Sequence, residues 1–415
     1  MTASKSQPKG WLGKWNSIPL YIRILGCLVL GVFTGLLLGK DAMIFEIPSK
    51  VILQLLGALA PPLILVAVVH VLITSSITGK SAGRLMFLLI LNTTVAILIG
   101  LMVANVMQPG KWSKFKEPDK NAAHKTETVS PVDLLVQNVP KSILGPLGDK
   151  QNIIGVIIIA LAFGIALRGA REMPIKDVQS LVEVAYDVLV RVLHWIIQLV
   201  PLGVFAIVAK VVGTEGFSPL KAMGAFIVAV VLALGLQTTW YLTRIRLFCW
   251  ARPLYVLRGM RDALVMAFST DSSTVTMPVT YACLKEKVGV REESASLGAL
   301  VGANFNNDGT ALYEAMAALF IAQLIGRDLT FTQQLMVILT SIIASVGAAG
   351  IPEAGLVTMT LVFTAVGLPT QYIALLLTVD WFLDRCRTTI NVLGDVNVSC
   401  LLDGKTRQAP VEAVS

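Results

Sequence analysis

The chain has 415 residues, of which 55% are hydrophobic and only 14% are charged. Soluble domains carry about 25% charged residues, so this composition excludes an ordinary water-soluble protein. An apolar helix needs about 20 residues to cross a bilayer. Five stretches of at least that length lack Asp, Glu, Lys and Arg, namely 51–79, 85–110, 222–243, 329–352 and 354–379. We therefore expect an all-α polytopic membrane protein.

The apolar runs predict spans near 18–39, 51–75, 85–107, 152–169, 182–212 and 219–243, with a polar loop over 108–150. The first run contains Arg23 and lacks a small-residue cleavage pattern, so we interpret it as a span rather than a cleaved signal. The net charge of +8 is typical of basic cytoplasmic loops, and we expect no nucleic-acid partner. Basic residues gather at alternate span ends, the largest group being Arg244, Arg246, Arg252, Arg258 and Arg261. This asymmetry predicts that both termini lie in the cytoplasm. We expect the protein to reside in the cell membrane.

The stretch 255–402 differs from the rest, because polar and Gly/Pro-rich residues interrupt its apolar runs. One interruption is 269–278, followed by the Asn-Asn-Asp-Gly-Thr run at 306–310. The other is 347–355, followed by a polar helix at 380–395. Interrupted segments at corresponding positions of two halves indicate the binding site of a transporter. Two ordinary loops between short spans are the alternative interpretation.

The last apolar stretch carries polar residues whose steps of 4, 4, 3 and 4 place them on one helical face: Asp380, Asp384, Thr388, Asn391 and Asp395. Arg387 borders this stripe. A charge at mid-bilayer costs about 2.5–3.5 kcal/mol, so these side chains must face protein, water or a ligand. An arginine fork matches a carboxylate and an aspartate can bind an ammonium group. The stripe predicts a site for a zwitterion with an extra carboxylate, with a structural ion-pair network as the alternative.

Two further groups of residues indicate coupling ions. Asn306, Asp308, Asn391 and Asp395 offer only oxygen ligands, which suit a hard cation, and in a transporter that cation would be sodium. Glu314 lies in an apolar stretch and could carry a proton, although an ordinary buried acid is the alternative.

The motifs at 306–314, 347–355 and 384–395 resemble the dicarboxylate/amino acid:cation symporter family, most closely its glutamate/aspartate branch, which includes the excitatory amino-acid transporters. The resemblance implies eight transmembrane helices plus two re-entrant helical hairpins with inverted-repeat architecture, assembled as a homotrimer. A static scaffold would hold a transport domain that moves like an elevator. The implied segments are 1–17 (cytoplasmic N-terminus), 18–84 (scaffold spans 1–2), 85–107 (transport-domain span 3), 108–150 (extracellular loop), 151–213 (scaffold spans 4–5), 214–402 (span 6, first hairpin, span 7, second hairpin and span 8 of the transport domain) and 403–415 (cytoplasmic tail).

The resemblance also implies a role for each matching residue. Asp384 would bind the substrate ammonium and Arg387 its side-chain carboxylate. The other substrate-binding residues would be Thr310, Thr388 and Asn391, with backbone groups of Ser273 and Ile351 at the hairpin tips. Sodium would bind at three places: at Asp395 with backbone around Asn306 and Asn391; deeper, at Thr93, Asn306 and Asp308; and at hairpin backbone near Ser345–Ala348 with Thr310. Glu314 would be the proton carrier, and no resident cofactor is expected.

The resulting expectation is symport of L-glutamate or L-aspartate into the cell with sodium ions, with a proton as a further coupling ion. A proton-coupled carrier, or a carrier of neutral amino acids or C4-dicarboxylates, is the alternative within the family. An anion channel or ligand-gated receptor is a third class, although a channel needs an aligned open pore. We expect no enzyme, because no nucleophile–base pair or metal motif stands out. Asp271 at the first hairpin tip and Arg385 on the last span are expected to form an ion pair.

Overall fold

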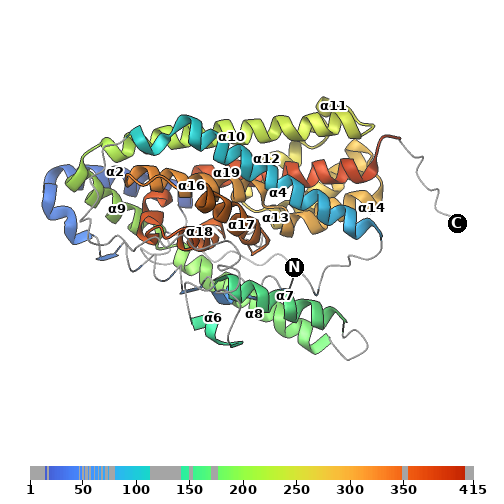
Figure 1. Ribbon diagram of the computed structural model, residues 1–415, viewed down its shortest axis with the longest axis horizontal. Helices are drawn as coiled ribbons and strands as arrows, with labels where there is room; N and C mark the ends of the chain where they lie inside the picture. Colours follow the sequence, from blue (N-terminus) through green and yellow to red (C-terminus); the bar gives the residue numbers. More distant parts are fainter. Residues whose placement is uncertain are drawn as a thin grey trace.

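The computed structural model describes residues 18–45, 80–112, 142–148, 153–169, 176–347 and 354–406, with single positions at 15 and between 47 and 73. Throughout this part of the chain the regular structure is helical, as Figure 1 shows. The all-helical class expected from the composition is therefore confirmed. Most of the predicted span 51–75 and of the loop 108–150 lies outside the described residues.

Three of the described helices are long and apolar enough to cross a bilayer. They belong to α2 (Leu20–Leu38), α4 (Lys80–Met107) and α10 (Ser218–Phe248), the first two with their short continuations η1 (Gly39–Phe45) and η2 (Pro109–Trp112). The shorter apolar helix α7 spans Ile153–Gly169, after the single turn α6 (Gly145–Gly148). Several apolar helices of membrane length thus define a multi-pass membrane protein.

The structure divides the predicted span 182–212 into two helices. The chain there forms two helices, α8 (Lys176–Ile197) and α9 (Val200–Glu215), bent by about 40° to one another. Pro201 lies in the first turn of α9 and has no N–H to continue the ladder of α8. Together the two helices are still long and apolar enough to make one broken span.

The ends of two spans also differ from the prediction. α4 begins at Lys80 rather than 85, because charged residues can continue a helix beyond the apolar run. α10 continues five residues past 243, and Arg244 is a buried residue of this helix with 5% exposure. Arg244, counted among the basic residues near a span end, therefore lies within the helix. It contacts the neighbouring helix α4, because its Nη1 donates a hydrogen bond to Asn92 Oδ1.

The first interruption is a break between two helices, α12 (Arg261–Thr270) and α13 (Ser273–Ala282), which follow the short α11 (Pro253–Gly259). Asp271 adopts a left-handed conformation (φ 59°) at the end of α12. Ser272 caps α13, its hydroxyl accepting a hydrogen bond from the backbone N–H of Val275 at 3.2 Å. The second interruption is flanked by α17 (Phe331–Gly347) and α18 (Ala354–Ala365), while 348–353 lies outside the described residues.

Another break separates α15 (Gly302–Phe305) from α16 (Asp308–Leu324), with Asn306 and Asn307 out of helical conformation. Short π-helical and α-helical turns precede it: η4 (Cys283–Val288), α14 (Glu292–Ala295) and η5 (Ser296–Val301). The chain ends with η6 (Thr370–Tyr372) and the long α19 (Ile373–Asp403). A helix interrupted at membrane depth leaves backbone groups that protein or a ligand must satisfy.

α16 and α19 form the centre of the molecule. Both are buried over most of their length, and they pack on one another and on α4 and α10 (Figure 1). Gly100 of α4 allows a close approach to α16, because a Cβ there would lie 2.9 Å from the carbonyl oxygen of Leu312. These contacts bring the polar face of α19 against the break before α16 and against both broken hairpins.

Candidate functional site

Arg387 of α19 is the central charged group of the site. Its side chain is fully buried, with Nη2 at 2.5 Å from Asp384 Oδ1 and Nη1 at 2.9 Å from Asp380 Oδ1. The three residues lie on one face of the helix because they are spaced by three and four residues. A buried arginine paired with two acids presents both signs of charge at one place. An amino acid could exchange its own carboxylate and ammonium for these internal pairs.

Groups from two other helices surround the guanidinium. The ring of Tyr313 on α16 lies 4.0 Å from Arg387 Cζ, which is a cation–π contact. Gly355, in the first turn of α18, faces Thr310 and Arg387: a Cβ there would lie 3.0 Å from Thr310 Cγ2 and 3.7 Å from Arg387 Nη1. The second hairpin therefore covers Arg387 with a residue that has no side chain.

The tip of the first hairpin reaches the same face of α19. Thr388 Oγ1 donates to Asp271 Oδ1 at 3.3 Å, and Arg385 Nη1 donates to the carbonyl oxygens of Phe268 and Ser269 at 2.8 Å each. Arg385 thus interacts with the last carbonyls of α12, where a positive charge is favourable. The expected Asp271–Arg385 ion pair stays a prediction. Ser273, in the first turn of α13, is 3% exposed and donates to the Ala303 carbonyl at 2.9 Å.

A second polar cluster lies about two turns beyond Arg387 and Thr388 on α19, around Asp395. Asn306 Nδ2 donates to Asp395 Oδ1 at 3.1 Å and to the Asn391 carbonyl at 3.2 Å, while the buried Asn306 Oδ1 has no hydrogen-bond partner. Gly302 allows the break to approach Asp395, since a Cβ there would collide with the carboxylate. A buried carboxylate beside an unpartnered carbonyl oxygen is a set of hard oxygen ligands that suits sodium.

Asp308 lies at the other side of the break and is fully buried. Thr93 Oγ1 of α4 donates to Asp308 Oδ1 at 2.7 Å, and the Tyr241 hydroxyl of α10 donates to Asp308 Oδ2. Gly394 makes room for this arrangement, because a Cβ there would lie 2.9 Å from the Tyr241 hydroxyl. The three helices α4, α10 and α16 therefore converge on one carboxylate.

Asn391 and Asn307 link the break to the second hairpin. Asn391 Oδ1 accepts from the backbone N–H of Gly309 at 2.8 Å, and its Nδ2 lies 3.4 Å from Asn307 Oδ1 and 3.5 Å from Thr310 Oγ1. Asn307 Nδ2 in turn donates to the Ser345 carbonyl on α17 at 2.9 Å. The amide of Asn307 thus holds the last turn of α17 against the start of α16.

Glu314 is a fifth buried acid near the site, after Asp380, Asp384, Asp395 and Asp308. It is fully buried on α16, and its Oε1 accepts a hydrogen bond from Thr358 on α18. Its Oε2 has no hydrogen-bond partner. The carboxyl group therefore lies between the α16 core and the hairpin that covers Arg387.

The structure brings together the described residues that the sequence singled out, in contacts that link α4, α12, α13, α16, α17 and α18 to α19. Ile351 lies outside the described residues. Sequence reasoning missed Tyr241 and Tyr313, which contact Asp308 and Arg387. It also assigned no role to Asp380, which pairs with Arg387. A tyrosine within an apolar helix gives no distinctive signal, whereas Asp380 was visible in the polar stripe.

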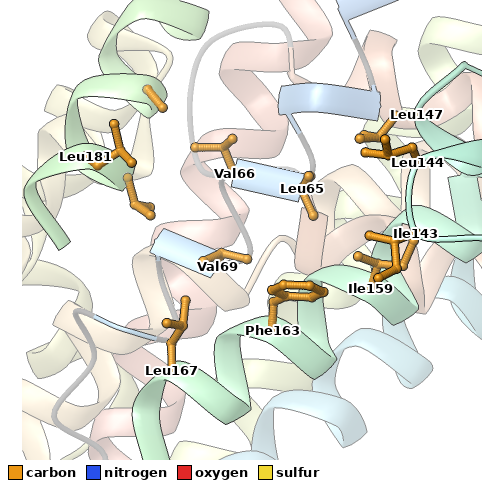
Figure 2. Close-up of a pocket in the computed structure, with 12 residues that line it drawn as sticks. Leu65, Val66, Val69, Ile143, Leu144, Leu147, Ile159, Phe163, Leu167 and Leu181 are labelled. Atoms are coloured by element: carbon orange, nitrogen blue, oxygen red, sulfur yellow. The ribbon is translucent and has the colours of Figure 1, made fainter. Parts of the chain in front are cut away.

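A cavity of about 350 Å³ lies elsewhere, between α7, α8 and the segments around 65–69 and 143–147. Figure 2 shows Phe163 and Leu167 of α7 facing Val66 and Val69 across it. All of its lining side chains are apolar. Because it offers no hydrogen-bond donor or charge, this cavity is not suited to a zwitterion.

Apolar helices of membrane length and a buried charged site between interrupted helices define a class, the secondary transporters. The sequence matches the Sodium:dicarboxylate symporter family over residues 20–405. The chain therefore belongs to this family and is a cation-coupled symporter, not an enzyme. The recognition made from the motifs is confirmed.

Relatives of known name are similar over almost the whole chain. Excitatory amino acid transporter 3 of Oryctolagus cuniculus is 30% identical, over 91% of this chain and 83% of its own length. Excitatory amino acid transporter 1 of Ambystoma tigrinum is 30% identical, over 94% and 83%. An excitatory amino acid transporter of Caenorhabditis elegans is 32% identical, over 91% and 85%.

Proposed function

We propose that the protein carries L-aspartate or L-glutamate into the cell together with sodium ions. The observation that carries the proposal is the fully buried Arg387, held by Asp384 and Asp380 under the second hairpin. Asp384 binds the substrate ammonium and Arg387 its side-chain carboxylate, because a guanidinium binds carboxylates bidentately. Thr310, Thr388 and Asn391 complete the site, with backbone groups of Ser273 and Ile351 at the hairpin tips.

Neutral amino acids fit this site less well, since they have no side-chain carboxylate to bind Arg387. C4-dicarboxylates have no ammonium group for Asp384. The simultaneous presence of a buried arginine and an adjacent aspartate in direct contact therefore supports an acidic amino acid as the substrate.

We assign the coupling ions to the oxygen clusters on either side of the substrate position. Asp395 with Asn306 and Asn391 forms one sodium site, which is supported by the unpartnered Asn306 Oδ1. Thr310 with the backbone near Ser345 forms another. Thr93, Asn306 and Asp308 form a deeper cation position. All of these groups are hard oxygen ligands.

The larger architecture completes the proposal. We assign eight transmembrane helices and two re-entrant hairpins, with both termini in the cytoplasm of a cell-membrane homotrimer. The segments 18–84 and 151–213 form the scaffold, while 85–107 and 214–402 form a transport domain that moves as an elevator. The second hairpin gates the site, in agreement with the position of Gly355 against Arg387.

The proposal is tested by uptake of labelled L-aspartate into proteoliposomes. An inward sodium gradient alone is expected to drive accumulation, with competition by L-glutamate but not by alanine or serine. Accumulation driven only by a proton gradient would favour the proton-coupled alternative. Competition by succinate alone would favour a dicarboxylate carrier, and no uptake under any gradient would refute the substrate assignment.

Glu314 gives a separate prediction about the proton. In Glu314→Gln we expect sodium-driven aspartate uptake to persist but to lose its acceleration by an inward proton gradient, because the amide cannot bind a proton. The Thr358 hydroxyl can still donate to the amide oxygen, so the fold should be retained. The measurement is substrate-coupled alkalinisation of the external medium, with Glu293→Gln, an exposed position on α14, as the control. Unchanged proton movement in Glu314→Gln would remove Glu314 from this role.

A further inference from the structure

Arg244 is a buried cation that the proposed substrate site does not use. It lies in α10 with 5% exposure, and none of the described acids forms an ion pair with it within 4.0 Å. Removing a guanidinium from water is costly unless other groups compensate the charge. A nearby negative charge must therefore account for its burial.

The contacts of Arg244 lead to Asp308. Its Nη1 donates to Asn92 Oδ1 on α4, and its guanidinium lies 5.6 Å from the centre of the Trp240 ring. Asn92 directly precedes Thr93, and Arg244 follows Tyr241 by three residues, about one helical turn. Thr93 and Tyr241 are the two residues that donate to Asp308. The Arg244 guanidinium thus lies beside the residues of α4 and α10 that donate hydrogen bonds to Asp308.

Further buried polar groups link the helices around Arg244. Asn92 Nδ2 lies 3.5 Å from Asn397 Oδ1, and Asn397 Nδ2 donates to the Tyr241 carbonyl at 3.0 Å. Gln237 Nε2 lies 3.5 Å from the Asn92 carbonyl. All of these side chains are buried, so little water screens the attraction between the guanidinium and the carboxylate.

Asp308 and Asp395 therefore differ in what balances their charge. Each carboxylate oxygen of Asp308 accepts a hydrogen bond from a hydroxyl group, and the Arg244 cation lies behind the two donor residues, Thr93 and Tyr241. Asp395 has no ion pair with any described basic residue, and the Asn306 Oδ1 beside it has no partner. The Asp395 cluster therefore has an unpartnered oxygen, Asn306 Oδ1, that could bind a sodium ion. Both carboxylate oxygens of Asp308 already accept hydrogen bonds.

We propose that Arg244 is a built-in counter-charge for Asp308 that takes the place of a sodium ion at the deeper cation position. This inference rests on the proposed function and revises one part of it, because it leaves sodium at the other proposed positions and removes it from the one at Asp308. Because this cation is part of α10, no sodium ion is transported at this position and the sodium gradient contributes no free energy there. Each sodium ion that is not coupled lowers the highest attainable substrate accumulation tenfold for every tenfold sodium gradient.

The test is equilibrium binding of ²²Na⁺ to the purified protein in detergent, without amino acid. Arg244→Leu is expected to bind one more sodium ion per chain than the wild type, because Asp308 loses its internal cation. Arg246→Leu, at an exposed position of the same helix, is the matched control and should bind the same number as the wild type. An equal number of ions in the wild type and in folded Arg244→Leu would overturn the proposal.

A second measurement covers the case in which Arg244→Leu folds but is strongly destabilised. The double variant Arg244→Leu/Asp308→Asn removes both charges, so its melting temperature should exceed that of both single variants in sodium-free buffer. It should also bind no additional sodium. If the effects of the two single substitutions on melting temperature simply add, the two residues do not compensate each other and the proposal is wrong.

These readouts are independent of the substrate. An extra ion in Arg244→Leu together with no aspartate uptake by the wild type would uphold the counter-charge and refute the substrate assignment. Sodium-driven aspartate uptake by the wild type with equal ion counts would do the reverse.

Discussion

Arg387→Cys is expected to abolish high-affinity aspartate uptake, lowering it by roughly 10²- to 10³-fold at low substrate concentration. The substitution leaves Asp380 and Asp384 buried side by side without their common cation. Breaking a buried ion pair by removing one partner costs about 3–5 kcal/mol, and 1.4 kcal/mol corresponds to a factor of ten. The substrate side-chain carboxylate would also lose the guanidinium proposed to bind it.

The same variant should bind and transport small neutral amino acids, because it no longer contains a buried guanidinium that needs a substrate side-chain carboxylate. The measurement is uptake of labelled aspartate and of labelled serine in parallel. Arg387→Lys is expected to recover little aspartate uptake, since an ammonium group cannot reproduce the bidentate fork. Arg258→Cys, at an exposed position of α11, is the control for loss of an arginine. Normal aspartate affinity in Arg387→Cys would refute the assignment of this residue.

The second large effect is expected from Gly309→Ala, which adds a single methyl group where α16 crosses α19. A Cβ at Gly309 would lie 2.6 Å from the carbonyl oxygen and 2.9 Å from the Cα of Arg387. These are backbone atoms that no rotamer change can move, so α19 must shift as a whole. Overpacking of this kind costs about 1–3 kcal/mol, and here it displaces Arg387 itself. We expect a fall of at least about tenfold in uptake and a lower melting temperature.

Gly224→Ala provides the matched control for Gly309→Ala. A Cβ at Gly224 meets nothing within 4 Å, and the residue lies inside α10. Alanine in a helix interior is favoured over glycine by about 0.5–1 kcal/mol, so this variant should be slightly more stable and fully active. Wild-type melting and uptake in Gly309→Ala would show that the contact between α16 and α19 tolerates a side chain.

Gly309 and Arg387 also indicate how the substrate and ion positions are connected. The backbone N–H of Gly309 donates to Asn391, whose carbonyl accepts from Asn306 beside Asp395. A displacement of the α16 break would therefore alter both clusters at once. This connection is why we expect substitutions at the break to change sodium dependence together with substrate affinity.

The sequence was sufficient to predict what depends on composition and on periodicity along a single helix. Low charge and long apolar runs determined the membrane class, and helical periodicity placed Asp384, Asn391 and Asp395 on one face of α19. The motifs at the two interruptions indicated the family. None of these inferences requires knowing which helix packs against which.

Contacts between helices were decided only by the tertiary structure. Nothing in the spacing of Tyr241 predicts that its hydroxyl meets Asp308, 67 residues away in sequence. Nor does the position of Arg244 at a predicted span end reveal that Asn92 of α4 covers it. A side chain's phase on its own helix follows from local geometry, whereas its partner on another helix depends on crossing angle and axial offset. Those quantities are set by close packing at positions such as Gly100 and Gly309, where the absence of a side chain allows the helices to meet.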